Sequence, residues 1–181
     1  MSGKAEVIVA GHICLDIIPT MEEKQSSLAT LLSPGKLVNI GPAVISTGGA
    51  VSNTGLVLHR LGSKVKLMGK IGADPFGHTI LTLLRQQDPS LVEGMIVSPE
   101  ANSSYSIVIS PPNMDRMFLH STGANDTYAA SDLKQEHLLG AKLFHFGYPP
   151  LMKNMYENEG VELVSLLKKV KASGLTVSLD M

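Results

Sequence analysis

A strand–helix–strand unit near the start of the chain most narrows what this sequence can fold into. Residues 6–11 form a short apolar run that ends in glycine, and residues 65–69 form a second one. Between them, residues 49–61 carry apolar side chains three or four positions apart, and Gly62 follows as a helix stop. Short apolar runs joined through a helix are typical of parallel strands. We therefore predict an α/β fold built on a parallel sheet.

The rest of the chain repeats these strand and helix patterns. Two strand-like runs flank the turn-rich segment 111–115, Pro-Pro-Asn-Met-Asp, and predict an antiparallel hairpin. After a final predicted strand, an open sheet normally continues with another loop and helix, so we expect a C-terminal part of the domain to be missing. The predicted helices are 79–87 and 160–173, and the predicted strands are 104–110, 116–121, 142–146 and 175–180.

Composition is that of an ordinary soluble globular protein with one domain. Hydrophobic residues are 44% and charged residues 17% of the 181 positions, and the net charge is −1. Without a block of like charges we expect no nucleic-acid partner, and no apolar run approaches the roughly 20 residues that span a membrane. Cys14 is the only cysteine. It excludes an internal disulfide, fits a cytoplasmic location and is interpreted as a small residue of a buried strand.

Three short motifs carry a family resemblance. They are Gly-His-Ile-Cys-Leu-Asp at 11–16, Gly-Gly-Ala-Val-Ser-Asn at 48–53 with the later Gly62 and Gly72, and Gly-Ala-Asn-Asp at 123–126. In this order and separation they resemble the N-terminal half of the ribokinase, or PfkB, family of carbohydrate kinases. The resemblance extends over essentially the whole chain, and the set of motifs is more specific than any one of them.

The resemblance implies a three-layer, Rossmann-like sheet with helices on both faces and a small β-sheet lid over the sugar. The lid would come from approximately residues 17–46 and 104–121. Such a lid excludes water from the reaction. Because an exposed strand edge invites pairing, a homodimer through the lid is also expected.

Four residues of the first two motifs are the main candidates for substrate binding. The carboxylate of Asp16 can accept hydrogen bonds from two neighbouring sugar hydroxyls. Gly48 and Gly49 allow a substrate to approach the backbone and begin a helix with free N–H donors. Asn53, one turn into that helix, offers a donor and an acceptor. Alternatively, Asp16 is a turn residue, Asn53 a capping or core amide, and the glycine pair only a helix entry.

Weaker candidates come from the predicted lid and from the segment after it. Ser106 or Tyr105 would touch the substrate from the hairpin, and Asn125 from the return loop. An ordinary surface hairpin is the alternative interpretation. In ribokinase a glutamate near the end of a later strand helps hold the sugar, but residues 144–150 here contain no carboxylate. The substrate is therefore not expected to be recognised as ribose is. Tyr148 is a candidate for stacking on a sugar or base, unless its loop only fixes a turn.

The family reaction transfers the γ-phosphoryl group of ATP to a sugar hydroxyl, with Mg²⁺ as cofactor. The family's catalytic base lies in an Asp-Thr-x-Gly-Ala-Gly-Asp motif, which is absent from residues 1–181. We therefore expect the base beyond residue 181, no protein ligand for a metal within this chain, and weak binding of ATP and Mg²⁺ by the chain alone. The chain would supply the substrate-binding half of a longer kinase and be inactive by itself.

Three other functions are alternatives to a sugar kinase for this chain. A non-catalytic sugar-binding or regulatory module would share the same cradle. A nucleoside kinase of the same family would differ only in the acceptor. A dinucleotide-binding domain requires Gly-x-Gly-x-x-Gly after the first strand, whereas His12, Ile13 and Cys14 follow Gly11 here. The sequence therefore disfavours the dinucleotide-binding function.

Overall fold

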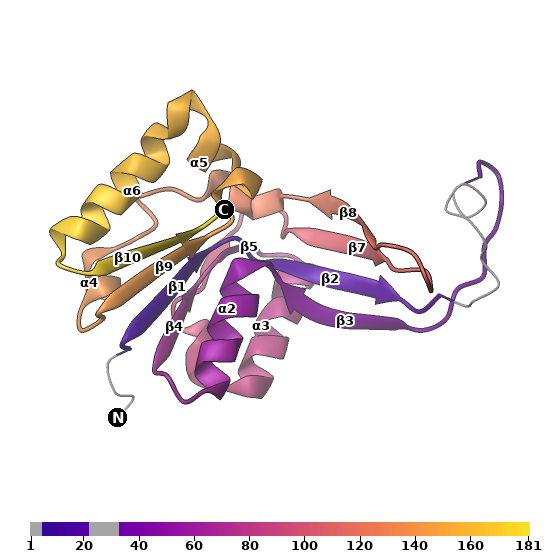
Figure 1. Cartoon of the computed structure of the whole chain (residues 1–181), viewed down its shortest axis with the longest axis horizontal. Helices are drawn as coiled ribbons and strands as arrows, with labels where there is room; N and C mark the ends of the chain where they lie inside the picture. Colours follow the sequence, from indigo (N-terminus) through magenta and orange to yellow (C-terminus); the bar gives the residue numbers. More distant parts are fainter. Residues whose placement is uncertain (1–4, 22–32) are drawn as a thin grey trace.

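The computed structural model describes residues 5–21 and 33–181, which form a three-layer body with a second, smaller sheet extending from it (Figure 1). The main sheet has four strands in the order β10-β9-β1-β4, all parallel. The strands are β1 (Val7–Gly11), β4 (Val65–Met68), β9 (Leu143–Gly147) and β10 (Thr176–Asp180).

Both faces of the main sheet are buried under helices. Alternate residues of β1 point to opposite sides, so that Ile8 packs in one core cluster with Phe144, while Val9 packs in the other with Leu67. Helices α2 (Gly49–Arg60) and α3 (Pro75–Gln87) lie on one face, and α6 (Val161–Ala172) lies on the other (Figure 1). The predicted three-layer α/β architecture is therefore confirmed.

Short elements connect these layers. A two-stranded parallel sheet pairs β5 with β6. The remaining short elements are β5 (Lys70–Gly72), β6 (Ile96–Ser98), α4 (Gln135–Leu138), α5 (Lys153–Tyr156) and the 3-10 helices η1 (Pro89–Val92), η2 (Gly123–Thr127), η3 (Pro149–Leu151) and η4 (Asn158–Gly160).

The second sheet, named the small sheet here, has the strand order β3-β2-β7-β8. Strand β2 pairs antiparallel with β3 and parallel with β7, and β7 forms the antiparallel hairpin with β8 at the predicted position. Residues 22–32 of the predicted segment 17–46 lie outside the described residues. The strands are β2 (Cys14–Pro19), β3 (Ala43–Gly48), β7 (Tyr105–Ile109) and β8 (Met117–Ser121).

Within the described residues, no helix combines the length and the apolar character needed to cross a membrane.

Candidate functional site

A row of polar side chains crosses all four strands of the small sheet. Asp16 on β2 lies opposite Ser46 on β3 and opposite Ser106 on β7, and Ser106 lies opposite His120 on β8. Residues directly opposite one another in a sheet project to the same face. These four residues, named the polar row, therefore present one carboxylate, two hydroxyls and one imidazole on a single face. Asp16 is thus a strand residue, not the turn residue of the alternative interpretation.

The carboxylate of Asp16 packs directly on the start of α2. A Cβ atom built on Gly48 would lie 2.3 Å from Asp16 Oδ2, a distance that no side chain can occupy. A larger residue at position 48 would therefore displace the Asp16 carboxylate from its observed position. We expected a substrate to approach the backbone at this glycine, but the carboxylate of Asp16 fills the space.

Gly49 is required by a different neighbour. Its φ is +82°, in the region that favours glycine, and an added Cβ would lie 2.5 Å from His12 Nδ1. The backbone N–H of Val51 also donates to the carbonyl oxygen of His12 at 3.1 Å. His12 thus occupies the start of α2 where an open donor set for a substrate was expected.

Asn53 lies one turn further along the same helix. It is exposed, and its side-chain amide makes no hydrogen bond within the described part of the chain. The structure thus brings Asp16 together with Gly48 and Gly49, while Asn53 stays a predicted ligand on the same helix without a contact to Asp16.

Two histidines meet beside the polar row. His12 Nε2 lies 3.2 Å from His120 Nε2, and His120 Nδ1 lies 2.9 Å from Ser106 Oγ. Burial and the neighbouring His120 lower the pKa of His12 to about 4, against a smaller opposing effect of Asp126. Burial also lowers the pKa of His120, although Asp16 and Asp126 oppose that shift. Both rings are therefore neutral at pH 7.

Cys14 is buried next to Asp16, as the interpretation of its strand position predicted. Its Sγ lies 3.3 Å from Asp16 Oδ1. Burial raises the pKa of the thiol well above its usual value, and the charge of Asp16 raises it further. The sulfur is therefore a neutral hydrogen-bond donor, unsuited to act as a nucleophile.

Asn125 is fully buried and its amide is used by the backbone. Its Oδ1 accepts from the N–H of Ile13 at 3.2 Å, and its Nδ2 donates to the carbonyl oxygens of Ile13 at 2.8 Å and Thr122 at 3.1 Å. These bonds support a structural role that fixes the segment between His12 and Cys14, and they use both hydrogens and one acceptor site of the amide.

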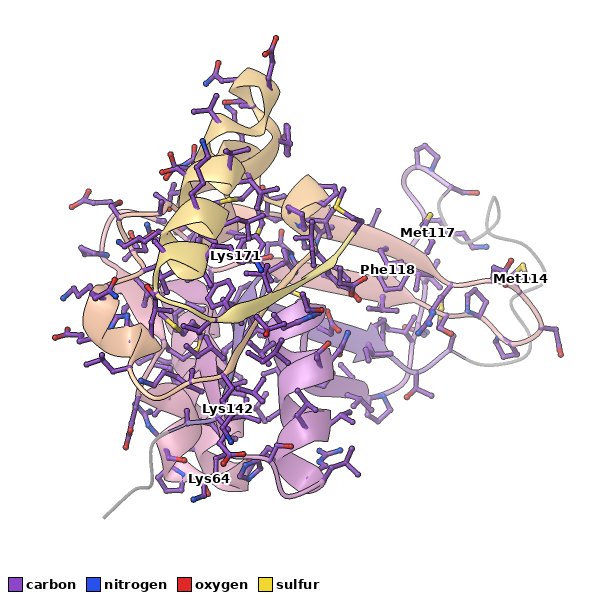
Figure 2. All side chains as sticks on the ribbon, turned by 60° about the vertical axis from the view of Figure 1, so that its left-hand side comes forward. Lys64, Met114, Met117, Phe118, Lys142 and Lys171 are labelled. Carbon is purple, nitrogen blue, oxygen red and sulfur yellow. The ribbon has the colours of Figure 1, made fainter. Side chains whose placement is uncertain are left out.

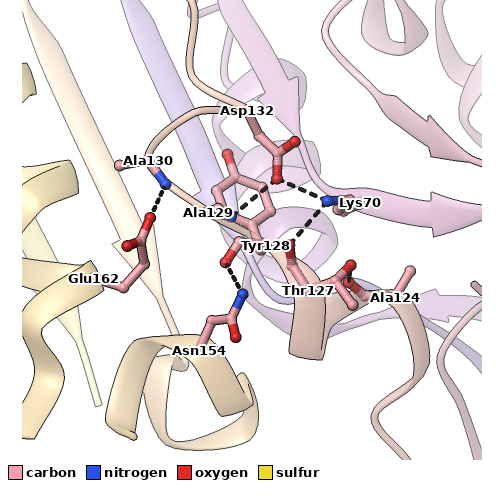
Figure 3. Close-up of polar contacts among 9 residues, drawn as sticks. All are labelled: Lys70, Ala124, Thr127, Tyr128, Ala129, Ala130, Asp132, Asn154 and Glu162. Atoms are coloured by element: carbon pink, nitrogen blue, oxygen red, sulfur yellow. Dashed lines mark hydrogen bonds and ion pairs between the residues drawn. The ribbon is translucent and has the colours of Figure 1, made fainter. Parts of the chain in front are cut away.

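The segment that follows Asn125 is itself anchored to β5 (Figure 3). Lys70 Nζ donates to the carbonyl oxygen of Thr127 and to Asp132 Oδ2, both at 2.9 Å. Asp132 Oδ2 also accepts from the N–H of Ala129 at 2.9 Å. Because charged partners make the stronger hydrogen bonds, this network holds the segment that carries Asn125 in a fixed position.

Two aromatic residues lie near the polar row on different sides. Tyr148 follows β9 with φ 60° and ψ 47°, and its ring centre lies 6.3 Å from that of His12. A bulky residue in this left-handed conformation is strained, and such strain concentrates at functional sites. Tyr105 instead packs its ring on Phe76 at 5.2 Å, and its partner across the sheet is Leu15, on the face opposite to Asp16.

Two hollows lie away from the polar row. The larger, about 570 Å³, lies at the amino ends of the main-sheet strands and is lined by residues such as Lys64 and Glu136. The smaller, about 220 Å³, is apolar and is lined by residues such as Pro150 and Tyr156. His12 and Tyr148 follow the carboxyl ends of β1 and β9, where parallel sheets bind ligands. We therefore take the polar row and its neighbours as the candidate site.

The chain matches the model of the pfkB family of carbohydrate kinases over residues 4–175. It belongs to this family. Probable fructokinase-4 of Arabidopsis thaliana is 25% identical over 174 residues, which cover 94% of this chain and 50% of that protein. Fructokinase-2 of Solanum lycopersicum is 26% identical over 148 residues, which cover 81% of this chain and 42% of that protein. The pfkB-family chain thus spans about half the length of the curated relatives it matches.

Solved structures agree with this family fold. A fructokinase from Xylella fastidiosa superposes with a TM-score of 0.76 at 19% identity, covering 99% of this chain and 51% of that one. The Arabidopsis thaliana ribokinase complexed with ribose and ATP gives a TM-score of 0.74 at 17% identity, covering 99% and 54%. At this level of identity the likeness establishes the fold.

Sequence reasoning on this pfkB-family chain missed His12 and His120 as members of the site. They are 108 positions apart, so no local spacing links them. A signal for His120 did exist, because the strand pairs of a hairpin centred on Asn113 place residue 106 opposite residue 120. His145 lies in β9, and its Nδ1 is 3.1 Å from Ser178 Oγ on the neighbouring strand β10.

Proposed function

We propose that this chain supplies the sugar-binding half of an ATP-dependent kinase that phosphorylates a sugar hydroxyl, with the small sheet as its lid. The observation that carries the proposal is the polar row, which has a carboxylate at its centre and lies against the start of α2. The proposed substrate-binding set consists of Asp16, Gly48, Gly49 and Asn53. The two glycines contribute by leaving room for the side chains of Asp16 and His12.

The charges of the site favour a neutral, hydroxyl-rich acceptor. The polar row, His12 and Cys14 together contain one carboxylate and no lysine or arginine. Both histidines are neutral at pH 7 because their pKa values are lowered by burial. A carboxylate accepts hydroxyl hydrogens strongly and repels anionic groups. A free sugar is therefore favoured over a sugar acid or a sugar phosphate.

The names of the relatives suggest which sugar to test first. The curated proteins described above are fructokinases, and one of the solved structures is a ribokinase holding ribose. Fructose is the first candidate, ribose the second, and a nucleoside remains the alternative acceptor. A non-catalytic sugar-binding module is separated from the kinase by measuring turnover with MgATP in a longer protein that contains this chain. The free thiol of Cys14 fits the proposed cytoplasmic location.

ATP is the proposed phosphoryl donor, and it would bring Mg²⁺ as its partner. One of the solved structures with a similar fold is a fructokinase with bound ATP from Xylella fastidiosa. Among the described residues, no group of three or more His, Cys, Asp or Glu side chains could hold a metal ion. Mg²⁺ that accompanies a nucleotide is held by its phosphates, by water and by one or two carboxylates, so few ligands from the protein would be needed.

The decisive experiment is a calorimetric titration of the chain with D-fructose, D-ribose and adenosine. Asp16→Asn should weaken binding of the preferred sugar by about tenfold or more, because a charge-assisted hydrogen bond is worth roughly 1.5–3 kcal/mol. Asp115→Asn, a change to an exposed carboxylate in the β7–β8 turn, is the matched control and should bind as the unchanged protein does. Equal sugar affinity in both variants would contradict the proposal. Turnover with MgATP is measured on a longer kinase that contains this chain, because the chain by itself is expected to be inactive.

A further inference from the structure

We propose that His12 and His120 are positioning residues of the sugar site, because they begin one directional chain of hydrogen bonds that ends on the Asp16 carboxylate. The inference rests on the proposed function, in which Asp16 binds the sugar. It adds two residues to the site and assigns a direction to every bond between them and Asp16.

The chain consists of four contacts in series. His12 Nε2 lies 3.2 Å from His120 Nε2, and His120 Nδ1 lies 2.9 Å from Ser106 Oγ. Ser106 Oγ lies 3.9 Å from Cys14 Sγ, and Cys14 Sγ lies 3.3 Å from Asp16 Oδ1. Sulfur contacts are longer than oxygen contacts, and the serine–cysteine link is the weakest of the four.

The Asp16 end fixes the direction of the last contact and permits the same direction for the contact before it. An ionised carboxylate only accepts, so the S–H of Cys14 must point at Asp16. The sulfur then has only lone pairs left, and the hydroxyl hydrogen of Ser106 can point at it. Ser106 Oγ in turn accepts from His120 Nδ1–H.

The His12 end fixes the same direction independently. His12 Nδ1 is buried and has no hydrogen-bond partner in the described structure. It faces Gly49, where an added Cβ would be 2.5 Å away, so a hydrogen on the Gly49 Cα points toward this nitrogen. An N–H there would meet that C–H head-on, whereas a lone pair accepts it as a weak hydrogen bond. His12 therefore carries its proton on Nε2 and donates to His120 Nε2.

The His12 end thus requires this arrangement of protons, and the Asp16 end is compatible with it. His120 accepts at Nε2 and donates at Nδ1, which is one neutral tautomer. The reverse arrangement would bury an unpaired N–H at His12, which is an unfavourable state for a buried donor.

The chain joins the main sheet to the small sheet. His12 follows β1 of the main sheet, His120 and Ser106 lie on the β7–β8 hairpin, and Cys14 and Asp16 lie on β2. The thiol holds Asp16 Oδ1, while Oδ2 accepts no hydrogen bond within the described residues. The orientation of the carboxylate, with Oδ2 beside Gly48 and free to accept a hydrogen bond, therefore depends on the position of the hairpin.

The first test measures the tautomers directly and needs no sugar. Long-range ¹H–¹⁵N spectra of the uniformly labelled chain at pH 7 should show His12 as the Nε2–H tautomer and His120 as the Nδ1–H tautomer. Finding His12 protonated on Nδ1, or either ring charged at this pH, would overturn the proposal whatever the protein binds.

The second test measures sugar affinity by the titration described above. Ser106→Ala breaks the chain and should weaken binding about tenfold, whereas Ser106→Thr keeps the hydroxyl and should bind within about twofold of the unchanged protein. His78→Gln, a change at an exposed histidine of α3, is the control and should have no effect. If alanine and threonine at 106 bind alike, the chain does not position Asp16. If the unchanged protein binds no sugar, the proposed function fails, and the tautomer spectra still decide the hydrogen-bond chain.

Discussion

At the scale of single residues, the site could be predicted in part because some residues belong to local motifs. Asp16 and the glycine pair were found from motifs that lie at predictable points, the entry to β2 and the start of α2. The reason for the glycines was not predictable, because the side chains that fill their Cβ positions come from His12 and Asp16 in another part of the chain. The hydrogen bonds between Asn125 and the backbone of Ile13 were not predictable either, because the two residues are 112 positions apart.

The lowered pKa of His12 makes stability depend on pH. In the unfolded chain this imidazole titrates near 6.5 and in the folded protein near 4, so between these values the unfolded state binds more protons. The free energy of unfolding therefore rises with pH across this window. The stability gained in this way is lost again as the pH falls from about 6.5 toward 4. His12 alone accounts for a loss on the order of 3 kcal/mol.

Urea unfolding at pH 7, 5.5 and 4.5 measures this dependence. His12→Gln should flatten the curve relative to the unchanged protein, and His78→Gln should leave it as it was. His120 and His137, whose pKa values are also lowered by burial, act in the same direction, so the difference between variant and parent reports His12 together with its interaction with His120. The prediction is wrong if His12→Gln loses as much stability on acidification as its parent.

At the scale of elements, boundaries were predicted well where glycine or proline ends a segment and poorly where a cap begins one. Helix α2 and strand β10 lie within one residue of the predicted bounds. Helix α3 begins at Pro75 instead of the predicted residue 79, because Asp74 caps it and Pro75 suits the first helical position. That signal was present in the sequence, but the apolar periodicity used to define the helix starts one turn later.

Asp74 does more than cap α3, and its removal should be costly. Oδ1 accepts from the N–H of Gly77 at 2.8 Å and from Ser103 Oγ at 2.7 Å, and Oδ2 accepts from the N–H of Ser103 at 2.7 Å. Asp74→Ala loses the cap and leaves buried Ser103 without these partners, so we expect about 2–3 kcal/mol of destabilisation. Chemical denaturation measures it, with exposed Asp115→Ala as the matched control. A loss below about 0.5 kcal/mol, the usual range for surface changes, would contradict this role.

At the scale of the whole molecule, the parallel sheet and the β7–β8 hairpin followed from sequence patterns, whereas the three layers and the complete small sheet followed only from the family resemblance. Apolar strands joined through a helix leave few alternatives to a parallel sheet covered on both faces. The small sheet joins β2 to β7, which are separated by about ninety positions, through backbone pairing that no local pattern encodes. Its strand order also creates the polar row, so the central feature of the site could not be derived from local sequence.

The same strand order leaves β8 as an exposed apolar edge. Three apolar side chains lie at this end of the molecule, far from Lys64 and Lys142 (Figure 2). They are Met117 and Phe118 on β8, and Met114 in the turn before it. Phe118 is 52% exposed, with the Arg116 guanidinium 5.6 Å from its ring centre. Exposed apolar edge strands promote pairing between copies of a chain, so we propose reversible dimerisation through β8.

Sedimentation equilibrium over a range of protein concentrations tests this proposal. The unchanged chain should show a monomer–dimer equilibrium, and Phe118→Lys should shift it toward monomer by about tenfold, because a charge on the edge opposes strand pairing. Val57→Lys on α2 is the matched control, since Val57 is also 52% exposed, and it should leave the equilibrium unchanged. A monomer at every concentration, or equal effects of the two lysines, would exclude β8 as the dimer surface and leave only the intramolecular role of the hairpin, in which His120 and Ser106 orient Asp16.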